Sequence, residues 1–136
     1  MKVLLTLSIV IILFGSFIAL LNTTSLFAPF GDEFDKAFFA SGGITDPERQ
    51  FQQWTYGVVG ATMVGWGIFM LFIIRYAFPE RKRWAWSCFL TGIVTWYVID
   101  SGISAYHGVG ANVILNTVIL VLTMVPLAAV RGEMNK

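Results

Sequence analysis

The stretch VLLTLSIVIILFGSFIALL, residues 3–21, has nineteen residues and no charged side chain. A helix needs about 20 consecutive, mostly apolar residues to cross the hydrocarbon core of a bilayer. This stretch therefore predicts a transmembrane helix. Lys2 precedes it, as in a signal peptide, but the apolar region is longer than usual and residues 17–22 offer no small-x-small cleavage site. We interpret the stretch as a retained signal-anchor helix.

Three further apolar runs follow, at Trp54–Ile74, Trp84–Ile99 and Val109–Val130. The middle one extends to about Ala105 if Asp100 is tolerated within it. The predicted fold is all-α, an integral membrane four-helix bundle that forms a single domain over residues 1–136. Its helices and outer loop are expected at about 3–21, 47–77, 84–105 and 109–130, with the loop at 22–46.

Composition agrees with a membrane protein and narrows its chemistry. Hydrophobic residues make up 57% of the chain and charged residues 12%, against about 45–50% and about 25% in soluble domains. A net charge of +1 excludes a nucleic-acid binder. The single Cys excludes an internal thiol relay, and the single His excludes bis-His haem and a His-based metal centre. We expect no catalytic residue, no metal and no cofactor.

Basic residues predict the orientation of the chain, because loops on the cytoplasmic side carry an excess of Lys and Arg. Only Lys36 and Arg49 lie on the side of the long first loop. The other side carries seven basic residues: Lys2, Arg75, Arg81, Lys82, Arg83, Arg131 and Lys136. Both termini should therefore be cytoplasmic, and the first loop and the 100–110 turn should face outward.

The long first loop contains four phenylalanines at helical spacing, Phe27, Phe30, Phe34 and Phe38. The spacing is typical of a short amphipathic helix that lies on the outer membrane surface or caps the bundle. A Phe-rich loop that packs on the helix ends is an equal alternative. After it, the segment 45–48 predicts the start of the next helix near residue 47, with either a capping box or an Asp cap before a first-turn Pro.

Small residues predict where helices pack closely, because membrane helices associate through close backbone contact and polar side chains. Gly57, Ala61 and Gly65 recur at four-residue spacing, and Cys88 and Gly92 share that spacing on the next helix. We interpret these positions as intramolecular packing surfaces, with a homodimer seam as the alternative. In the last run, Pro126 should kink the helix or end its regular hydrogen bonding.

Asp100 is the one acid next to an apolar run. If the helix enters the membrane at Trp84, Asp100 lies about 24 Å along its axis, roughly one turn below the outer interface. An ionisable residue at that depth is a candidate functional site. It predicts an outward-facing polar pocket, with Arg49 or protonated His107 as the partner of Asp100. The predicted members of the pocket are Asp100, Arg49, Gln53, Tyr56, Tyr97, Ser104, His107, Asn112 and Asn116.

A structural role is the alternative for the same residues. Asp100 can cap or anchor the end of its helix, and Asn112 and Asn116 can hold two helices together by hydrogen bonds.

The start of the second apolar run, Trp54-Thr55-Tyr56-Gly57, follows a signal-anchor helix and an outer loop. A basic inner turn comes next, and the last helix ends in Arg131. In this arrangement the chain resembles small four-helix bacterial membrane proteins, including DoxX-like and related families. The resemblance implies a multi-pass protein of the bacterial cytoplasmic membrane, sometimes associated with membrane redox complexes.

Two classes of function agree with these features. The first is a non-enzymatic accessory or assembly component of a membrane complex. The alternative is a small transporter or ligand-binding protein that uses the pocket around Asp100. The expected partners are the lipid bilayer and a membrane protein or a second copy of the chain, and no nucleic acid.

Overall fold

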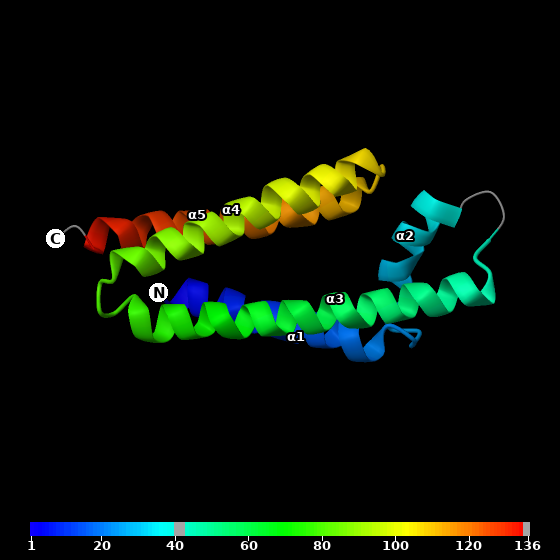
Figure 1. Ribbon diagram of the computed structural model, residues 1–136, viewed down its shortest axis with the longest axis horizontal. Helices are drawn as coiled ribbons and strands as arrows, with labels where there is room; N and C mark the ends of the chain where they lie inside the picture. Colours follow the sequence, from blue (N-terminus) through cyan, green and yellow to red (C-terminus); the bar gives the residue numbers. More distant parts are fainter. Residues whose placement is uncertain (40–42, 135–136) are drawn as a thin grey trace. The chain divides into compact units, whose positions relative to one another are not determined.

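The computed structural model describes residues 1–39 and 43–134, and within them it is all-helical, without a strand. Figure 1 shows the order of these helices along the chain. The helices are α1 (Lys2–Leu21), α2 (Ala28–Phe39), α3 (Asp46–Phe72), α4 (Arg83–Tyr106) and α5 (Gly110–Met134), and a π-helical turn, η1 (Ile73–Ala77), follows α3 directly. The predicted positions of the long helices are confirmed to within a few residues. Four of the helical segments are long and apolar enough to cross a membrane.

Thr45 and Glu48 begin α3. The backbone N–H of Thr45 donates to Oε2 of Glu48 over 2.8 Å, and the Thr45 hydroxyl donates to the same oxygen over 2.6 Å. The N–H of Arg49 donates to the carbonyl of Thr45, which is the first bond of the helix. Thr45 is therefore the N-cap, and of the two predicted helix starts the capping box is confirmed.

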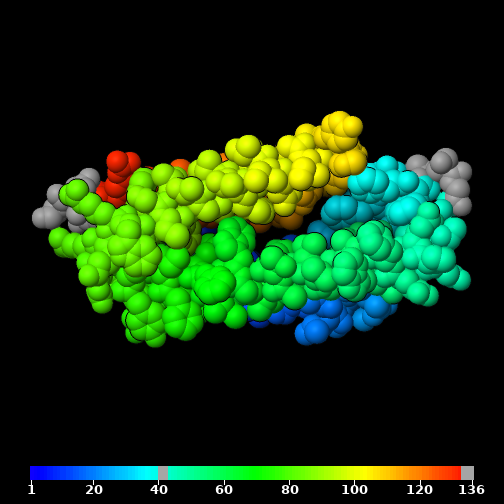
Figure 2. All heavy atoms as spheres, viewed as in Figure 1, coloured from blue at the N-terminus to red at the C-terminus, as the bar shows by residue number. Residues whose placement is uncertain are grey.

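The chain divides into two compact units, each described here by itself. Unit 1 contains Met1–Ile9 and the chain from Ile68 onward, and unit 2 contains Val10–Gly67. The helices α1 and α3 are continuous and contribute to both. On the face of α3 visible in Figure 2, the side chains lie uncovered along the length of the helix. Large apolar groups such as Phe51 and Phe69 are exposed on this helix.

In unit 1, α4 and α5 form an antiparallel hairpin (Figure 1). Its core contains buried apolar side chains from both helices, among them Phe89, Ile93 and Leu127. Near the other end of the hairpin from the turn, Trp86 Nε1 donates to the carbonyl of Leu127 over 2.9 Å, and the Arg131 guanidinium lies 4.5 Å from the centre of the Trp86 ring.

The turn between α4 and α5 explains why the two helices lie side by side. Gly108 has φ of +75°, a conformation that glycine adopts without steric cost. The N–H of Val109 donates to the carbonyl of Ser104, and the N–H of Gly108 donates to the carbonyl of Ala105. This pair of bonds is a Schellman motif, which ends α4 and reverses the chain within a few residues.

Pro126 does not end α5, which continues to Met134. Of the two predicted effects of Pro126, an end of the helix does not occur, and the kink stays a prediction. A proline removes one N–H donor from a helix, and the neighbouring turns of α5 maintain the helix across that gap.

In unit 2, α1 and α3 meet backbone to backbone at Gly15 and Gly60. A Cβ on Gly60 would lie 2.5 Å from the carbonyl oxygen of Gly15 and from the backbone nitrogen of Ala19. A Cβ on Gly15 would lie 2.7 Å from the carbonyl oxygen of Gly60. Only glycine at both positions allows this approach.

The predicted packing surface on α3 is therefore the wrong face for its contact with α1. A Cβ on Gly57 or on Gly65 would meet nothing within 4 Å, and Ala61 between them is exposed. The predicted packing surface on α4 is open in the same way: Cys88 is exposed, and a Cβ on Gly92 would meet nothing within 4 Å. A glycine-rich helix has small residues on more than one face, and the position of Gly15 on α1 determines which face is used.

The Phe-rich segment forms α2, so the helical alternative is confirmed. Phe27, directly before α2, is buried with its ring 5.0 Å from that of Tyr56. Phe30 lies against Phe14 and Phe34 lies against Tyr56. The stripe thus packs on α1 and α3 within unit 2, as in the predicted capping arrangement.

Candidate functional site

Asp100 on α4 is the centre of a polar cluster in unit 1. Its Oδ1 accepts hydrogen bonds from Nδ2 of Asn112 over 2.7 Å and from Nδ2 of Asn116 over 2.8 Å. The hydroxyl of Ser104 donates to the same oxygen over 3.2 Å. Three donors from two helices therefore converge on one carboxylate oxygen.

Helix geometry and the short turn produce this convergence. Residues four apart lie on the same face of a helix, so Asp100 and Ser104 face α5 together, and Asn112 and Asn116 face α4 together. The Schellman turn at Gly108 brings these two faces into contact. The sequence pattern and the turn are sufficient to place the four side chains in one cluster.

The cluster extends through two further bonds. Nδ2 of Asn112 also donates to Oγ of Ser104 over 2.8 Å, and Nδ2 of Asn116 donates to Oγ of Ser101 over 3.3 Å. Asn116 is 3% exposed, and Ser101 and Ser104 are also buried, whereas Asp100 is half-buried. These groups satisfy one another where little water reaches them.

One side of the cluster opens at the surface of α4. A hollow of about 510 Å³ is lined by Trp96, Ile99, Asp100, Ile103 and Ser104. Its wall is mostly apolar apart from Asp100 and Ser104. The hollow gives a small solute a route to the carboxylate.

One helical turn away, Tyr97 and Thr117 form a second link between α4 and α5. Their hydroxyl oxygens are 3.2 Å apart. Because Thr117 donates its only hydrogen to the carbonyl of Val113 over 2.8 Å, Tyr97 must be the donor in this pair. The link is therefore a structural contact between the helices next to the Asp100 cluster.

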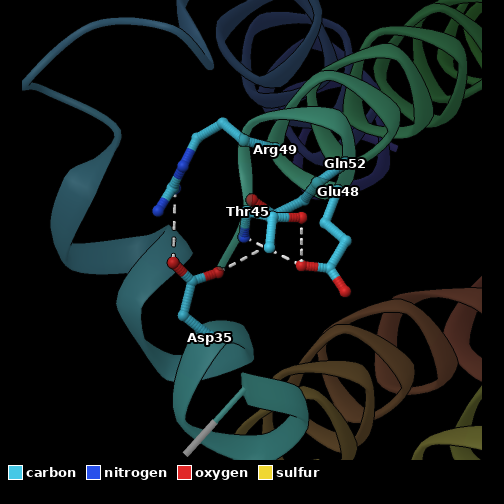
Figure 3. Close-up of polar contacts among 5 residues, drawn as sticks. All are labelled: Asp35, Thr45, Glu48, Arg49 and Gln52. Atoms are coloured by element: carbon cyan, nitrogen blue, oxygen red, sulfur yellow. Dashed lines mark hydrogen bonds and ion pairs between the residues drawn. The ribbon is translucent and has the colours of Figure 1, made fainter. Parts of the chain in front are cut away.

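A separate polar cluster occurs in unit 2, where α2 meets α3 (Figure 3). Asp35 accepts a hydrogen bond from Gln52 Nε2 over 2.6 Å and forms an ion pair with Arg49 over 3.3 Å. These contacts join the polar side of α2 to the start of α3.

A small cavity of about 150 Å³ lies beside this second cluster. Asn22 is among the residues that line it, and Nδ2 of Asn22 donates to the carbonyl of Ile18, while its Oδ1 is buried without a partner. The lining also includes Asp35, Arg49, Gln53 and Tyr56. A single water molecule is sufficient to satisfy Oδ1 of Asn22 in a cavity of this size.

The outer face of α2 is solvated. Lys36 donates to Glu33 over 2.7 Å, and both side chains are mostly exposed. The hydrogen bond from Lys36 and the charge of Glu33 raise the pKa of Lys36 above its ordinary value. Exposed pairs of this kind contribute little to stability, so α2 is held by its phenylalanines and by Asp35.

The predicted pocket thus separates into two clusters that belong to different units. Asp100, Ser104, Asn112 and Asn116 come together as predicted. Tyr97 is one turn away, and His107 is the exposed C-cap of α4, with its ring 5.0 Å from that of Tyr106. Three predicted members belong to the cluster or cavity of unit 2: Arg49, Gln53 and Tyr56.

Arg49, which was predicted as a possible partner of Asp100, forms an ion pair with Asp35 within unit 2. The prediction also missed Ser101, Asp35 and Gln52. Ser101 was detectable, since its side chain lies within one helical turn of Asp100 and Ser104. Asp35 and Gln52 were not, because no periodicity shows which face of α2 meets α3.

Among the described residues, no group of three or more His, Cys, Asp or Glu side chains could hold a metal ion. The Asp100 cluster presents one carboxylate surrounded by amide and hydroxyl groups, which suits a positively charged or hydrogen-bonding ligand.

Comparisons of the chain with protein-family models, curated proteins and solved structures find no match.

Proposed function

We propose that this chain is a small multi-pass membrane protein that acts as a non-enzymatic accessory or assembly component of a membrane complex. The four long apolar helices support insertion into a bilayer. The excess of basic residues within the turn Arg75–Arg83 and near the two termini supports a cytoplasmic location of both termini. The resemblance to DoxX-like and related small four-helix proteins supports the bacterial cytoplasmic membrane as its location.

The observation that carries this proposal is the open small-residue surface on α3. Among the described residues, a Cβ on Gly57 or on Gly65 would meet nothing within 4 Å, and the contact with α1 is made at Gly60. Membrane helices associate where small residues let two backbones approach. The face around Gly57, Ala61 and Gly65 therefore suits a helix of a partner protein or of a second copy.

The test is co-purification from native membranes in mild detergent. The double variant Gly57→Leu, Gly65→Leu places large side chains on this surface, where a Cβ meets nothing within 4 Å, and should lose co-purifying subunits. Gly132→Leu is the matched control, because a Cβ there also meets nothing within 4 Å. An unchanged set of co-purifying proteins in the double variant would contradict the proposal.

The Asp100 cluster favours a second candidate, a small transporter or ligand-binding protein with an outward-facing pocket. Its support is the half-buried carboxylate at the wall of an open hollow. Intramembrane acids are costly and commonly mark ligand or ion pathways. Uptake of solutes by proteoliposomes, compared between the native protein and Asp100→Asn, tests it; equal uptake by both would eliminate this candidate.

A further inference from the structure

In the part of the chain that the structure describes, Asp100 accepts hydrogen bonds from the neutral side chains of Ser104, Asn112 and Asn116. The ion pairs of the described residues join Lys36 to Glu33, Arg49 to Asp35 and Lys82 to Glu80. None of them includes Asp100. A carboxylate inside a membrane segment is costly unless a positive charge accompanies it, and a bound cation would supply that charge.

The groups around Asp100 are unusually rich in oxygen. Ser101 and Ser104 contribute hydroxyl oxygens, and Asn112 and Asn116 contribute amide oxygens, all on side chains joined to Asp100 directly or through one hydrogen bond. Carboxylate, amide carbonyl and hydroxyl oxygens are ligands that hard cations prefer. A proton needs only one such oxygen, whereas this cluster provides several.

The two asparagines provide a way to accept a cation. Their Nδ2 groups point at Oδ1 of Asp100 and satisfy the carboxylate when no cation is present. Amide oxygen and nitrogen are similar in size. A rotation of each amide group would therefore place its oxygen, in place of its nitrogen, toward a cation next to Asp100.

We propose that Asp100, Ser101, Ser104, Asn112 and Asn116 form a binding site for a small inorganic monovalent cation, with sodium as the representative ion. The hollow lined by Asp100 and Ser104 admits the ion from the surface of α4. One positive charge neutralises the one carboxylate, which is why a monovalent ion fits the cluster better than a divalent one. The inference rests on the second candidate function, because it names the ligand of that pocket.

Thermal unfolding of the purified full-length protein in detergent tests the site. The melting temperature is measured in sodium chloride and in N-methylglucamine chloride at equal ionic strength. A ligand that binds only the folded state raises its stability in proportion to the logarithm of the ligand concentration above Kd. We expect a rise of several degrees in sodium that grows with the logarithm of its concentration and is lost in Asp100→Asn.

The matched control is Asp35→Asn, which removes a carboxylate that already has Arg49 as its partner. This variant should keep the full sodium response. If Asp100→Asn does not fold, Ser101→Ala and Ser104→Ala keep the carboxylate and remove one oxygen each. In either of them the sodium concentration needed for a given rise in melting temperature should increase at least fivefold.

Direct binding of radioactive sodium by equilibrium dialysis provides the second measurement, with one ion per chain expected. Equal melting temperatures in the two salts together with absent binding would overturn the proposal. If the melting temperature depends on pH in the native protein but not in Asp100→Asn, and does not depend on sodium, the ligand of Asp100 is a proton and the sodium site is wrong.

The site and the second candidate function can fail separately. Sodium binding without uptake of any solute would support the sodium site and contradict the proposed transport function. Uptake that depends on Asp100, without any binding of sodium, would support the transport function and contradict the sodium site.

Discussion

Nδ2 of Asn116 donates a hydrogen bond to Oδ1 of Asp100 over 2.8 Å, although sixteen residues separate the two in the chain. The bond crosses from α5 to α4 at a point where Asn116 is almost completely buried. Water does not replace a bond lost at such a position, so the remaining polar atoms stay unsatisfied. The pair therefore links the stability of the α4–α5 hairpin to the state of the Asp100 carboxylate.

Replacement of this amide should weaken the hairpin. Asn116→Leu removes the donors to Asp100 and Ser101 while it keeps the branching and the number of side-chain heavy atoms, and we expect a loss of ~1–2 kcal/mol in the free energy of unfolding. Reversible unfolding in detergent measures this loss. The control is Ser87→Ala, because Ser87 is exposed on α4. In combination with Asp100→Asn the two losses should not add, because the residues share one bond. Simple additivity would show that the pair is not coupled.

The contact of α1 with α3 predicts opposite results for two glycines of the same helix. Gly60→Ala places a Cβ 2.5 Å from the backbone of α1, and overpacking of this kind costs ~1–3 kcal/mol. Gly57→Ala meets nothing and should be neutral or stabilising by up to ~1 kcal/mol, because alanine is the better helix former. The melting temperatures of the two variants in detergent test these opposite expectations. Equal values would place the backbone contact elsewhere.

Much of this fold was predictable, because four apolar runs of the right length leave little choice but helices. The α4–α5 half of the polar site was predictable for a related reason. A short turn at Gly108 makes the two helices neighbours, and four-residue spacing then brings Asp100 and Asn112 to a shared interface.

The other predictions required knowledge of which neighbouring helix each side chain faces, and the sequence does not provide it. Arg49 was assigned to Asp100 by its expected depth in the membrane, but depth does not determine which helix a residue faces. The close contact at Gly60 was missed for the same reason, since Gly57 and Gly65 have equally suitable spacing. The partner surface decides between such faces, and it lies elsewhere in the chain, at Gly15 of α1 in this case.

The turn itself provides a further prediction. Gly108→Ala introduces a side chain at φ of +75°, and we expect a loss of about 1 kcal/mol in stability. Gly110→Ala, two residues later, has an ordinary φ and open space around it, and should be neutral. Unfolding of the two variants in detergent gives the comparison. A neutral result for Gly108→Ala would show that the reversal of the chain does not depend on this conformation.

The proposed orientation predicts which loops a reagent reaches from outside the cell. In a Cys88→Ser background, a cysteine is introduced by Glu33→Cys on α2 or by Glu80→Cys in the basic turn. Both native side chains are more than half exposed, so both cysteines should react after permeabilisation. In intact cells, a membrane-impermeant maleimide should label only the Glu33→Cys protein, because basic turns are retained in the cytoplasm. Labelling of the Glu80→Cys protein alone would place both termini outside, and partial labelling of both would indicate insertion in two orientations.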